Sequence, residues 1–314
     1  MKKFLIVPTI RKHSIENFLQ SWKDIADWDC LIVVEDNPEK SFKIDCDFHY
    51  SWQEIQEDLK EDSWIISRRD SAIRCYGFYK AFQLGADYVF TLDDDCLPVN
   101  NGNFCNKHVE NLENTTKWCE TVLGHRTRGI PYRNQGVLKN VKFSLGLWQG
   151  NPDFDAITSL SLKSDEIELT KTRVLPHGQY FPFCGMNFAF KRDVCLLSYF
   201  PLMGENQPFK RFDDIWFGLI CKKICDHLKF YIVCGEPHIN HVRASDPFEN
   251  LTKEAPGIKY NEKLWEIIEE INLKSFNVKD CMIEISDNLE NQNDPYLKNL
   301  SKAIKIWIKL FEKV

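Results

Sequence analysis

Three consecutive aspartates, Asp93, Asp94 and Asp95, follow the short apolar run YVFTL at residues 88–92. The run predicts a buried strand of a parallel sheet, so the acids come to the carboxyl edge, where open α/β sheets bind their ligands. Carboxylates at alternate positions point the same way and can hold one divalent cation, which can bridge the phosphates of a nucleotide. We therefore predict Asp93 and Asp95 as metal ligands. The alternative is an acidic turn that only ends the strand.

A basic and polar cluster precedes this strand, at the start of a predicted helix that leads into it. The cluster contains Arg68, Arg69, Asp70, Ser71 and Arg74. Helix N-termini and guanidinium groups both favour phosphate oxygens, so Asp70 and Arg74 are predicted to contact a nucleotide. A solvated helix face is the alternative for the arginines.

The elements before the cluster alternate as in a Rossmann-like half. A strand in residues 4–10 and a helix in residues 14–26 precede a second strand, CLIVVEDN, at residues 30–37. Asp36, at the end of that strand, is placed to hydrogen-bond a ribose or a base, or else lies in a solvated turn. The first strand is not followed by the GxGxxG pattern, which argues against a flavin or nicotinamide cofactor.

Bulk properties narrow the class of protein. The 314 residues, of which 43% are hydrophobic, can form one large α/β domain or a domain with an appendage. The net charge of −6, without a basic stripe, argues against a nucleic-acid partner. Pro8 ends the first apolar run too early for a signal peptide, and no stretch is long enough to cross a bilayer, so we predict a cytoplasmic protein without membrane insertion. The twelve cysteines lack paired CxxC spacings and are predicted to be free thiols.

Further candidates lie downstream of the acidic strand. The arginine-rich segment HRTRGIPYRNQG, residues 125–136, predicts a loop whose Arg126, Arg128 and Arg133 can neutralise charge on a leaving diphosphate, if they are not simply solvated. Asp213 and Asp214 begin a predicted helix, where they either cap it or grip sugar hydroxyls. His241 follows a strand-like segment and is predicted to complete the metal site with Asp95.

The ordered motifs of the chain resemble those of the reversibly glycosylated polypeptide family, which includes plant UDP-arabinopyranose mutases. The motifs are VPTIR (7–11), RDSAIRCYG (69–77), DDDC (93–96), RGIPY (128–132), GLW and PDFDA (146–156), FPFCGMNFAF (181–190), RFDDIW (211–216), ICDHL (224–228) and ASDPFENL (244–251). The resemblance covers the chain to about residue 260 and extends more weakly to the C-terminal helix.

The resemblance implies a Rossmann-like nucleotide-diphospho-sugar transferase fold of the A type, with a mixed sheet flanked by helices. We expect a catalytic domain at 1–260 and a helical extension at 261–314 packed on it, whose amphipathic final helix could also form a homo- or hetero-oligomer contact. The resemblance also implies a divalent metal, Mn²⁺ or Mg²⁺, and interconversion of UDP-arabinopyranose with UDP-arabinofuranose, a step in polysaccharide biosynthesis.

The site residues that the resemblance implies fall into two groups. Arg128 matches the reversibly glycosylated arginine, and we expect catalytic roles for Arg128, Arg133, Asp213 and Asp214. Nucleotide or sugar contacts are expected from Pro8, Thr9, Arg11, Asp36, Asp70, Arg74, Asp94, Trp148, Asp155, Cys184, Gly185 and Asn187. Two alternatives stay open: a glycosyltransferase that moves a sugar to itself or to an external acceptor, and a non-catalytic subunit that binds the nucleotide sugar.

Overall fold

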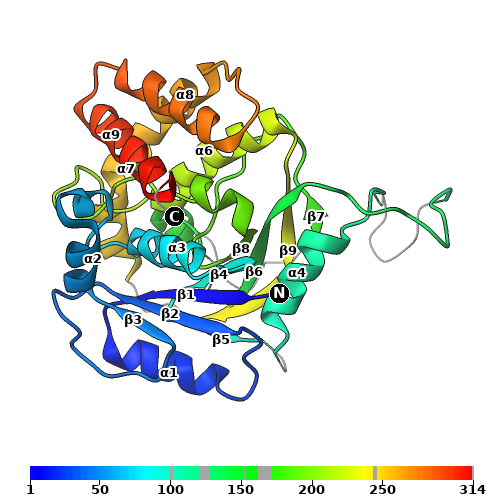
Figure 1. Ribbon diagram of the computed structural model, residues 1–314, viewed down its shortest axis with the longest axis horizontal. Helices are drawn as coiled ribbons and strands as arrows, with labels where there is room; N and C mark the ends of the chain where they lie inside the picture. Colours follow the sequence, from blue (N-terminus) through cyan, green and yellow to red (C-terminus); the bar gives the residue numbers. More distant parts are fainter. Residues whose placement is uncertain (100–101, 120–127, 152, 162–171, 243–245, 313–314) are drawn as a thin grey trace.

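The computed structural model describes residues 1–99, 102–119, 128–151, 153–161, 172–242 and 246–312, and is built on one mixed β-sheet (Figure 1). The strand order is β3-β2-β1-β4-β8-β6-β9-β5, and β7 pairs with β9. The strands are β1 (Lys3–Thr9), β2 (Cys30–Glu35), β3 (Phe48–Tyr50), β4 (Tyr88–Leu92), β5 (Cys96–Pro98), β6 (Val141–Gly150), β7 (Arg173–Val174), β8 (Asn187–Lys191) and β9 (Tyr231–His241).

Strands β3, β2, β1 and β4 are mutually parallel and form the half that the sequence predicts. Strand β8 then runs antiparallel to both β4 and β6, with Phe190 opposite Val89 on one side and Phe143 on the other. Strand β6 therefore runs in the same direction as β4. The carboxyl ends of β1, β2 and β4 share one edge of the sheet, and the chain enters β6 at the opposite edge.

Helices cover both faces because the central strands are apolar on both sides. In β1, Phe4 and Ile6 face one core while Leu5 and Val7 face the other. Helices α1 (Lys12–Trp22) and α4 (Phe104–Asn114) pack on the second core. The first core is covered by α2 (Trp52–Leu59), α3 (Arg74–Gln83), α6 (Asp213–Leu228), α7 (Pro247–Glu270), α8 (Val278–Glu290) and α9 (Pro295–Glu312). The predicted class, a Rossmann-like mixed sheet flanked by helices with a helical C-terminal segment, is confirmed.

The final helix packs on the same core as the sheet. Trp307 is fully buried in α9, its ring lies 5.1 Å from that of Tyr199, and its indole Nε1 donates to the carbonyl of Leu196 at 2.8 Å. The expected boundary between residues 260 and 261 falls inside α7, which continues to Glu270. The division into two parts stays a prediction, with its boundary inside a continuous helix.

All twelve cysteines are free thiols, as predicted. Nine are buried, Cys46 and Cys184 are half-buried, and Cys119 is exposed. None of the helices in the described ranges is both long and apolar enough to cross a membrane.

Candidate functional site

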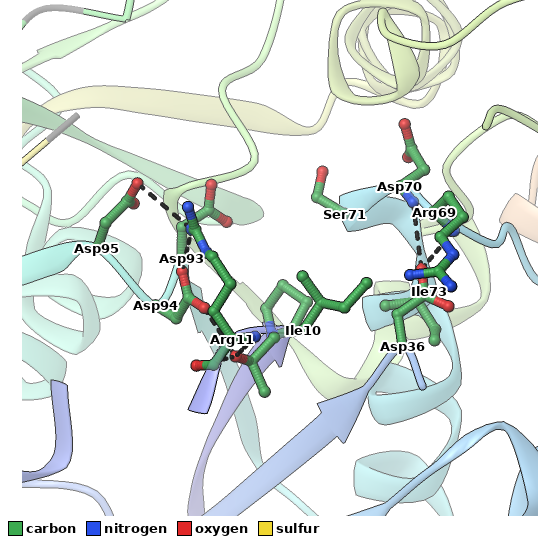
Figure 2. Close-up of a pocket in the computed structure, with 12 residues that line it drawn as sticks. Ile10, Arg11, Asp36, Arg69, Asp70, Ser71, Ile73, Asp93, Asp94 and Asp95 are labelled. Atoms are coloured by element: carbon green, nitrogen blue, oxygen red, sulfur yellow. Dashed lines mark hydrogen bonds and ion pairs between the residues drawn. The ribbon is translucent and has the colours of Figure 1, made fainter. Parts of the chain in front are cut away.

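A cavity of about 280 Å³ opens at the carboxyl edge of β1, β2 and β4, where the sequence predicts the site. Figure 2 shows two groups of side chains that face each other, with Ile10 between them: Arg11 with the three aspartates after β4, and Asp36 with the cluster after residue 68. The lining residues are Pro8, Thr9, Ile10, Arg11, Asp36, Arg69, Asp70, Ser71, Ile73, Asp93, Asp94 and Asp95. Eight of the predicted nucleotide or metal contacts thus border the cavity directly: Pro8, Thr9, Arg11, Asp36, Asp70, Asp93, Asp94 and Asp95.

Asp94 orients Arg11. Its carboxylate accepts from Arg11 Nη2 at 2.8 Å and from the Thr9 hydroxyl at 2.7 Å, and its side chain is only 6% exposed. Burial raises the pKa of Asp94, and the Thr9 and Arg11 contacts oppose that rise. The Arg11 guanidinium stays 46% exposed and also lies 3.9 Å from Asp95, so it is fixed at the cavity with donors to spare for an anionic ligand.

Asp36 offers the cavity a buried acceptor that no group in the described part of the chain satisfies. It is 4% exposed, and its Oδ2 accepts from the backbone N–H groups of Arg69 and Asp70. Its Oδ1 has no hydrogen-bond partner within the described residues, since Arg68 Nε is 3.8 Å away. Burial raises the pKa of Asp36 to about 6, against the lowering by the Arg69 hydrogen bond. A ligand N–H or O–H at Oδ1 would remove the cost of this unmade bond.

Arg74 lies behind the cavity wall and is completely buried. Its Nη1 donates to the Thr91 hydroxyl at 2.8 Å and to the Gly185 carbonyl, its Nε donates to the Ser71 carbonyl at 3.0 Å, and its Nη2 pairs with Asp93. The guanidinium thus joins the start of the cluster helix, the end of β4 and the turn before β8. These contacts are those of a residue that positions Asp93, whereas the sequence predicts a direct nucleotide contact for Arg74.

The predicted metal ligands are brought together in part. His241 Nε2 lies 3.7 Å from Asp95 Oδ1, and its Nδ1 is 2.7 Å from the carbonyl of Asn151. A carbonyl only accepts, so Nδ1 carries the proton, and in the neutral ring Nε2 presents its lone pair toward Asp95. Burial lowers the pKa of His241, but the charge of Asp95 and the hydrogen bond to the Asn151 carbonyl raise it above the usual value.

Asp95 Oδ1 is buried and has no hydrogen-bond partner among the described residues, as a carboxylate prepared for a cation would be. One carboxylate oxygen and one imidazole nitrogen suit a first-row divalent ion such as Mn²⁺. Asp93, the third predicted ligand, pairs instead with Arg74. The donor set at hand therefore fits a divalent ion through Asp95 and His241.

A second acidic group lies beside the turn before β8. One ligand atom each of Asp153, Cys184 and Asp214 lie within 4.8 Å of one another, a spacing suited to a metal ion. Cys184 Sγ is 2.8 Å from Asp153 Oδ2, and Asp214 Oδ2 accepts from the backbone N–H of Gly185 at 2.6 Å. Burial, followed by the charges of Asp153 and Asp214, raises the pKa of the Cys184 thiol. The sequence singles out Cys184, Gly185 and Asp214 but not this grouping, because its members are about 30 residues apart.

The paired acids at the start of α6 lie behind the cavity rather than on its surface. Ser71, which lines the cavity, donates its hydroxyl to Asp213 Oδ2 at 3.0 Å. Burial raises the pKa of Asp213, opposed by the charge of Arg74, and burial and then Asp213 raise the pKa of Asp214. Ser71 therefore connects Asp213 to the cavity.

Three other predicted contacts are engaged with protein groups. Asp155 accepts from the Thr158 backbone N–H at 3.0 Å at the start of α5 (Ala156–Ser161). Asn187 is fully buried, and its Nδ2 donates to the carbonyls of Leu147 and Pro237. Trp148 packs against the second core. Their ligand roles stay predictions, and none of the three borders the cavity.

Arg128 and Arg133 lie on a segment that leaves the body of the molecule. We call the described residues 115–119 and 128–140 the basic arm. Its base is an isolated bridge between Thr116 and Val137, with Leu138 N donating to Thr115 O at 2.7 Å. The arm precedes β6, so it starts at the edge of the sheet opposite the cavity, and Figure 1 shows it extending outward beyond α4. Arg126 lies outside the described residues.

The fold and site together define an α/β protein with an acidic cavity at the carboxyl edge of its parallel strands. The model of the family described as reversibly glycosylated polypeptide matches residues 3–314, and the chain belongs to that family.

Named relatives are similar over almost their full length. The probable UDP-arabinopyranose mutase 1 of Pisum sativum is 33% identical over 99% of this chain and 90% of its own. UDP-arabinopyranose mutase 2 of Arabidopsis thaliana is 33% identical over 99% and 91%, and mutase 1 of Oryza sativa subsp. japonica is 32% identical over 99% and 90%. A solved structure described as "Crystal Structure of a Mycobacterial Protein" aligns with 84% of this chain and 75% of its own, at 12% identity and a TM-score of 0.47.

Proposed function

We propose that the protein is a nucleotide-sugar mutase that interconverts UDP-arabinopyranose and UDP-arabinofuranose without a flavin, in the cytoplasm, on a path to cell-wall or surface polysaccharides. The names of relatives that match over nine-tenths of their length support the reaction. The observation that carries the site is the cavity with an unpartnered acceptor at one end and an exposed, fixed guanidinium at the other. Asp36 can accept a hydrogen bond from a neutral N–H or O–H group, and Arg11 can bind an anion. A nucleoside diphosphate carries both kinds of group, with its base and ribose on one side of the diphosphate.

The substrate is proposed to lie across the cavity. Asp36 Oδ1 accepts from the base or the ribose, and the backbone around Arg69 and Asp70 forms the wall beside it. The diphosphate lies against Arg11. A divalent ion held by Asp95 and His241 would supply positive charge to the leaving diphosphate.

The isomerisation needs one bond exchange and one proton transfer. The bond from C1 to the UDP oxygen breaks, the bond from C1 to the pyranose ring oxygen is replaced by a bond to O4, and UDP then returns to C1. One proton leaves the O4 hydroxyl and one is gained by the former ring oxygen. We propose that Asp213 and Asp214 exchange these protons with the sugar, with the Ser71 hydroxyl as the link to the cavity.

Arginine is protonated near neutral pH and is a poor nucleophile. We therefore propose an electrostatic role for Arg128 and Arg133 at the diphosphate, with glycosylation of Arg128 as a side reaction of the same activated sugar.

The deciding experiment is to incubate the purified protein with UDP-arabinopyranose and Mn²⁺ or Mg²⁺ and to resolve the nucleotide sugars by anion-exchange chromatography. We expect a UDP-arabinofuranose peak that EDTA removes. Asp95→Asn should lose the peak, whereas Asp24→Asn, which changes an exposed acid that does not line the cavity, should keep it. Labelled sugar on the protein or an acceptor without a furanose peak would identify a transferase instead, and no reaction at all would leave a binding subunit.

A further inference from the structure

The basic arm presents both cationic and exposed apolar side chains. Its described residues contain four cationic side chains and no carboxylate, although the whole chain has a net charge of −6. The cations are Lys117, Arg128, Arg133 and Lys139. Large apolar side chains accompany them: Tyr132 is 86% exposed, and Trp118 and Val137 are 44% exposed each. Aromatic and arginine side chains together are typical of the centre of a protein interface.

The cavity has the opposite character. Five aspartates and two arginines line it, and Arg74 behind the wall pairs with Asp93, which leaves an excess of two negative charges if all these groups are ionised. A divalent cation and the diphosphate of a bound nucleotide sugar would largely cancel each other, so this excess remains when the site is filled. Such an edge attracts a cationic surface.

The arm of the same chain is not placed to supply that surface. Phe143 of β6 is level with Val89 of β4, so residue 140 lies near the amino end of β4 while Asp93 follows its carboxyl end. Five strand residues at about 3.3 Å each separate the two levels by roughly 17 Å. From its base the arm then extends away from the body (Figure 1).

We propose that the basic arm of one copy docks on the carboxyl edge of a second copy and places Arg128 or Arg133 beside the bound diphosphate there. A two-fold axis makes the exchange reciprocal, with two arms and two sites in one dimer. The catalytic part of this inference rests on the proposed mutase activity, whereas the docking rests on charge and exposure alone.

The docking is tested by light scattering on the full chain. We expect the wild type to be a dimer and the double variant Arg128→Glu with Arg133→Glu to be a monomer. The matched control is Lys302→Glu with Lys309→Glu, which makes the same change of charge on exposed positions of α9 and should leave the dimer intact. A wild-type monomer at assay concentration, or a dimer that survives the arm variant, would overturn the docking.

The exchange of residues is tested by complementation. The arm variant Arg128→Ala with Arg133→Ala and the site variant Asp95→Asn, each expected to be inactive alone, are co-expressed with different tags and purified as mixed dimers and as the unsorted mixture. In a mixed dimer, the intact arm meets the intact site at one of two positions, so the unsorted mixture should recover about one quarter of wild-type turnover. Mixed dimers without activity would show that the arm acts on its own chain and would overturn the proposal.

The two proposals fail in different ways. A wild type without mutase activity contradicts the proposed function, while the light-scattering comparison still decides whether the arm docks. An active wild type whose mixed dimers stay inactive contradicts only the exchange.

Discussion

Arg74 is a charged side chain that connects several segments inside the protein. Its guanidinium is completely buried and donates to groups from three separate segments, among them the carboxylate of Asp93. Lysine has the same charge but presents its donors from a single nitrogen, without the planar fork.

We therefore expect Arg74→Lys to fold, with kcat lowered about 10- to 100-fold because small displacements of reacting groups have effects of that size. The Kd for UDP should change little, since Arg11 and Asp36 keep their places. Steady-state kinetics and calorimetry give the two numbers. Arg11→Lys is the comparison, because it should weaken UDP binding first. An Arg74→Lys enzyme with wild-type kcat would contradict the positioning role.

Asp36 should make UDP binding depend on pH. Its pKa is raised to about 6, and the ionised form accepts a stronger hydrogen bond than the neutral acid. Affinity for UDP should rise more steeply from pH 5 to pH 7 in the wild type than in Asp36→Asn, where only the ionisation of the UDP phosphate contributes. The affinities are measured by titration calorimetry with EDTA present, so that metal binding by Asp95 and His241 does not contribute to the difference between the two proteins. Equal pH dependence in both proteins would show that Asp36 does not contact UDP.

The raised pKa of Asp36 also makes the free energy of unfolding depend on pH, in a direction that follows from the pKa values. Asp36 holds its proton to about pH 6 when folded but loses it near pH 3.8 when unfolded. Between these values the folded state binds more protons, so the contribution of Asp36 to stability decreases as pH rises through this window and is constant above it. Urea unfolding at pH 4 and pH 7 should show a smaller decrease for Asp36→Asn than for the wild type.

For single residues, the sequence predicts which side chains have the chemistry to bind a ligand, but it does not predict which of them are buried. An arginine at a helix start is typical of an exposed position, and its burial becomes favourable only because Asp93, 19 residues later, meets it in the fold. The sequence likewise does not show that the amide of Asn187 is already satisfied. Its partners are the carbonyls of Leu147 in β6 and of Pro237 in β9, which are distant in the sequence.

The strand ends are the elements that the sequence predicts best. Apolar runs that stop at polar residues define both the strand and its carboxyl end, so the positions of Asp36 and of Asp93 to Asp95 followed from two short patterns, whereas Thr9 was implied by the resemblance. The basic arm has no such periodicity. Its direction depends on which edge of the sheet β6 enters, and that depends on pairing between strands about 50 residues apart.

The turn before β8 depends on a glycine in another element. A side chain at Gly218 of α6 would meet the backbone of Phe183 and lie 3.1 Å from the Phe181 carbonyl oxygen. Alanine favours a helix over glycine by about 1 kcal/mol, yet we expect Gly218→Ala to lower the free energy of unfolding by about 1–3 kcal/mol through overpacking.

Urea unfolding of Gly218→Ala measures this change, and Glu266→Ala, at an exposed helical position of α7, is the control. The turn also carries Cys184 and Gly185, so kcat should fall with stability in the glycine variant. A Gly218→Ala protein as stable as the wild type would mean that the close approach is not maintained in solution.

Across the whole molecule, the C-terminal helices and the sheet share one core. Tyr79 of α3, Tyr199 and Trp307 of α9 lie ring to ring, and Trp307 also bonds to the backbone of the turn that follows β8. We expect Trp307→Ala to cost about 3–5 kcal/mol and to shift a single unfolding transition rather than to create a second one.

Fluorescence and UDP binding followed along the same urea titration would test this expectation. Two separate transitions, with UDP binding lost in only one, would favour an independent extension beyond residue 260. The sequence predicts the amphipathic helix but not its partner, because apolar periodicity alone does not say which surface covers it.

The distribution of thiols has a practical use. Burial keeps eleven of the twelve cysteines partly or wholly inside the protein and raises the pKa of thiols such as Cys75 and Cys46, to about 12 and about 11. Cys119, the exposed one, lies at the base of the basic arm. A maleimide fluorophore added to the native chain should therefore attach mainly at this position, and its emission and anisotropy would report the surroundings of the arm without any engineered cysteine.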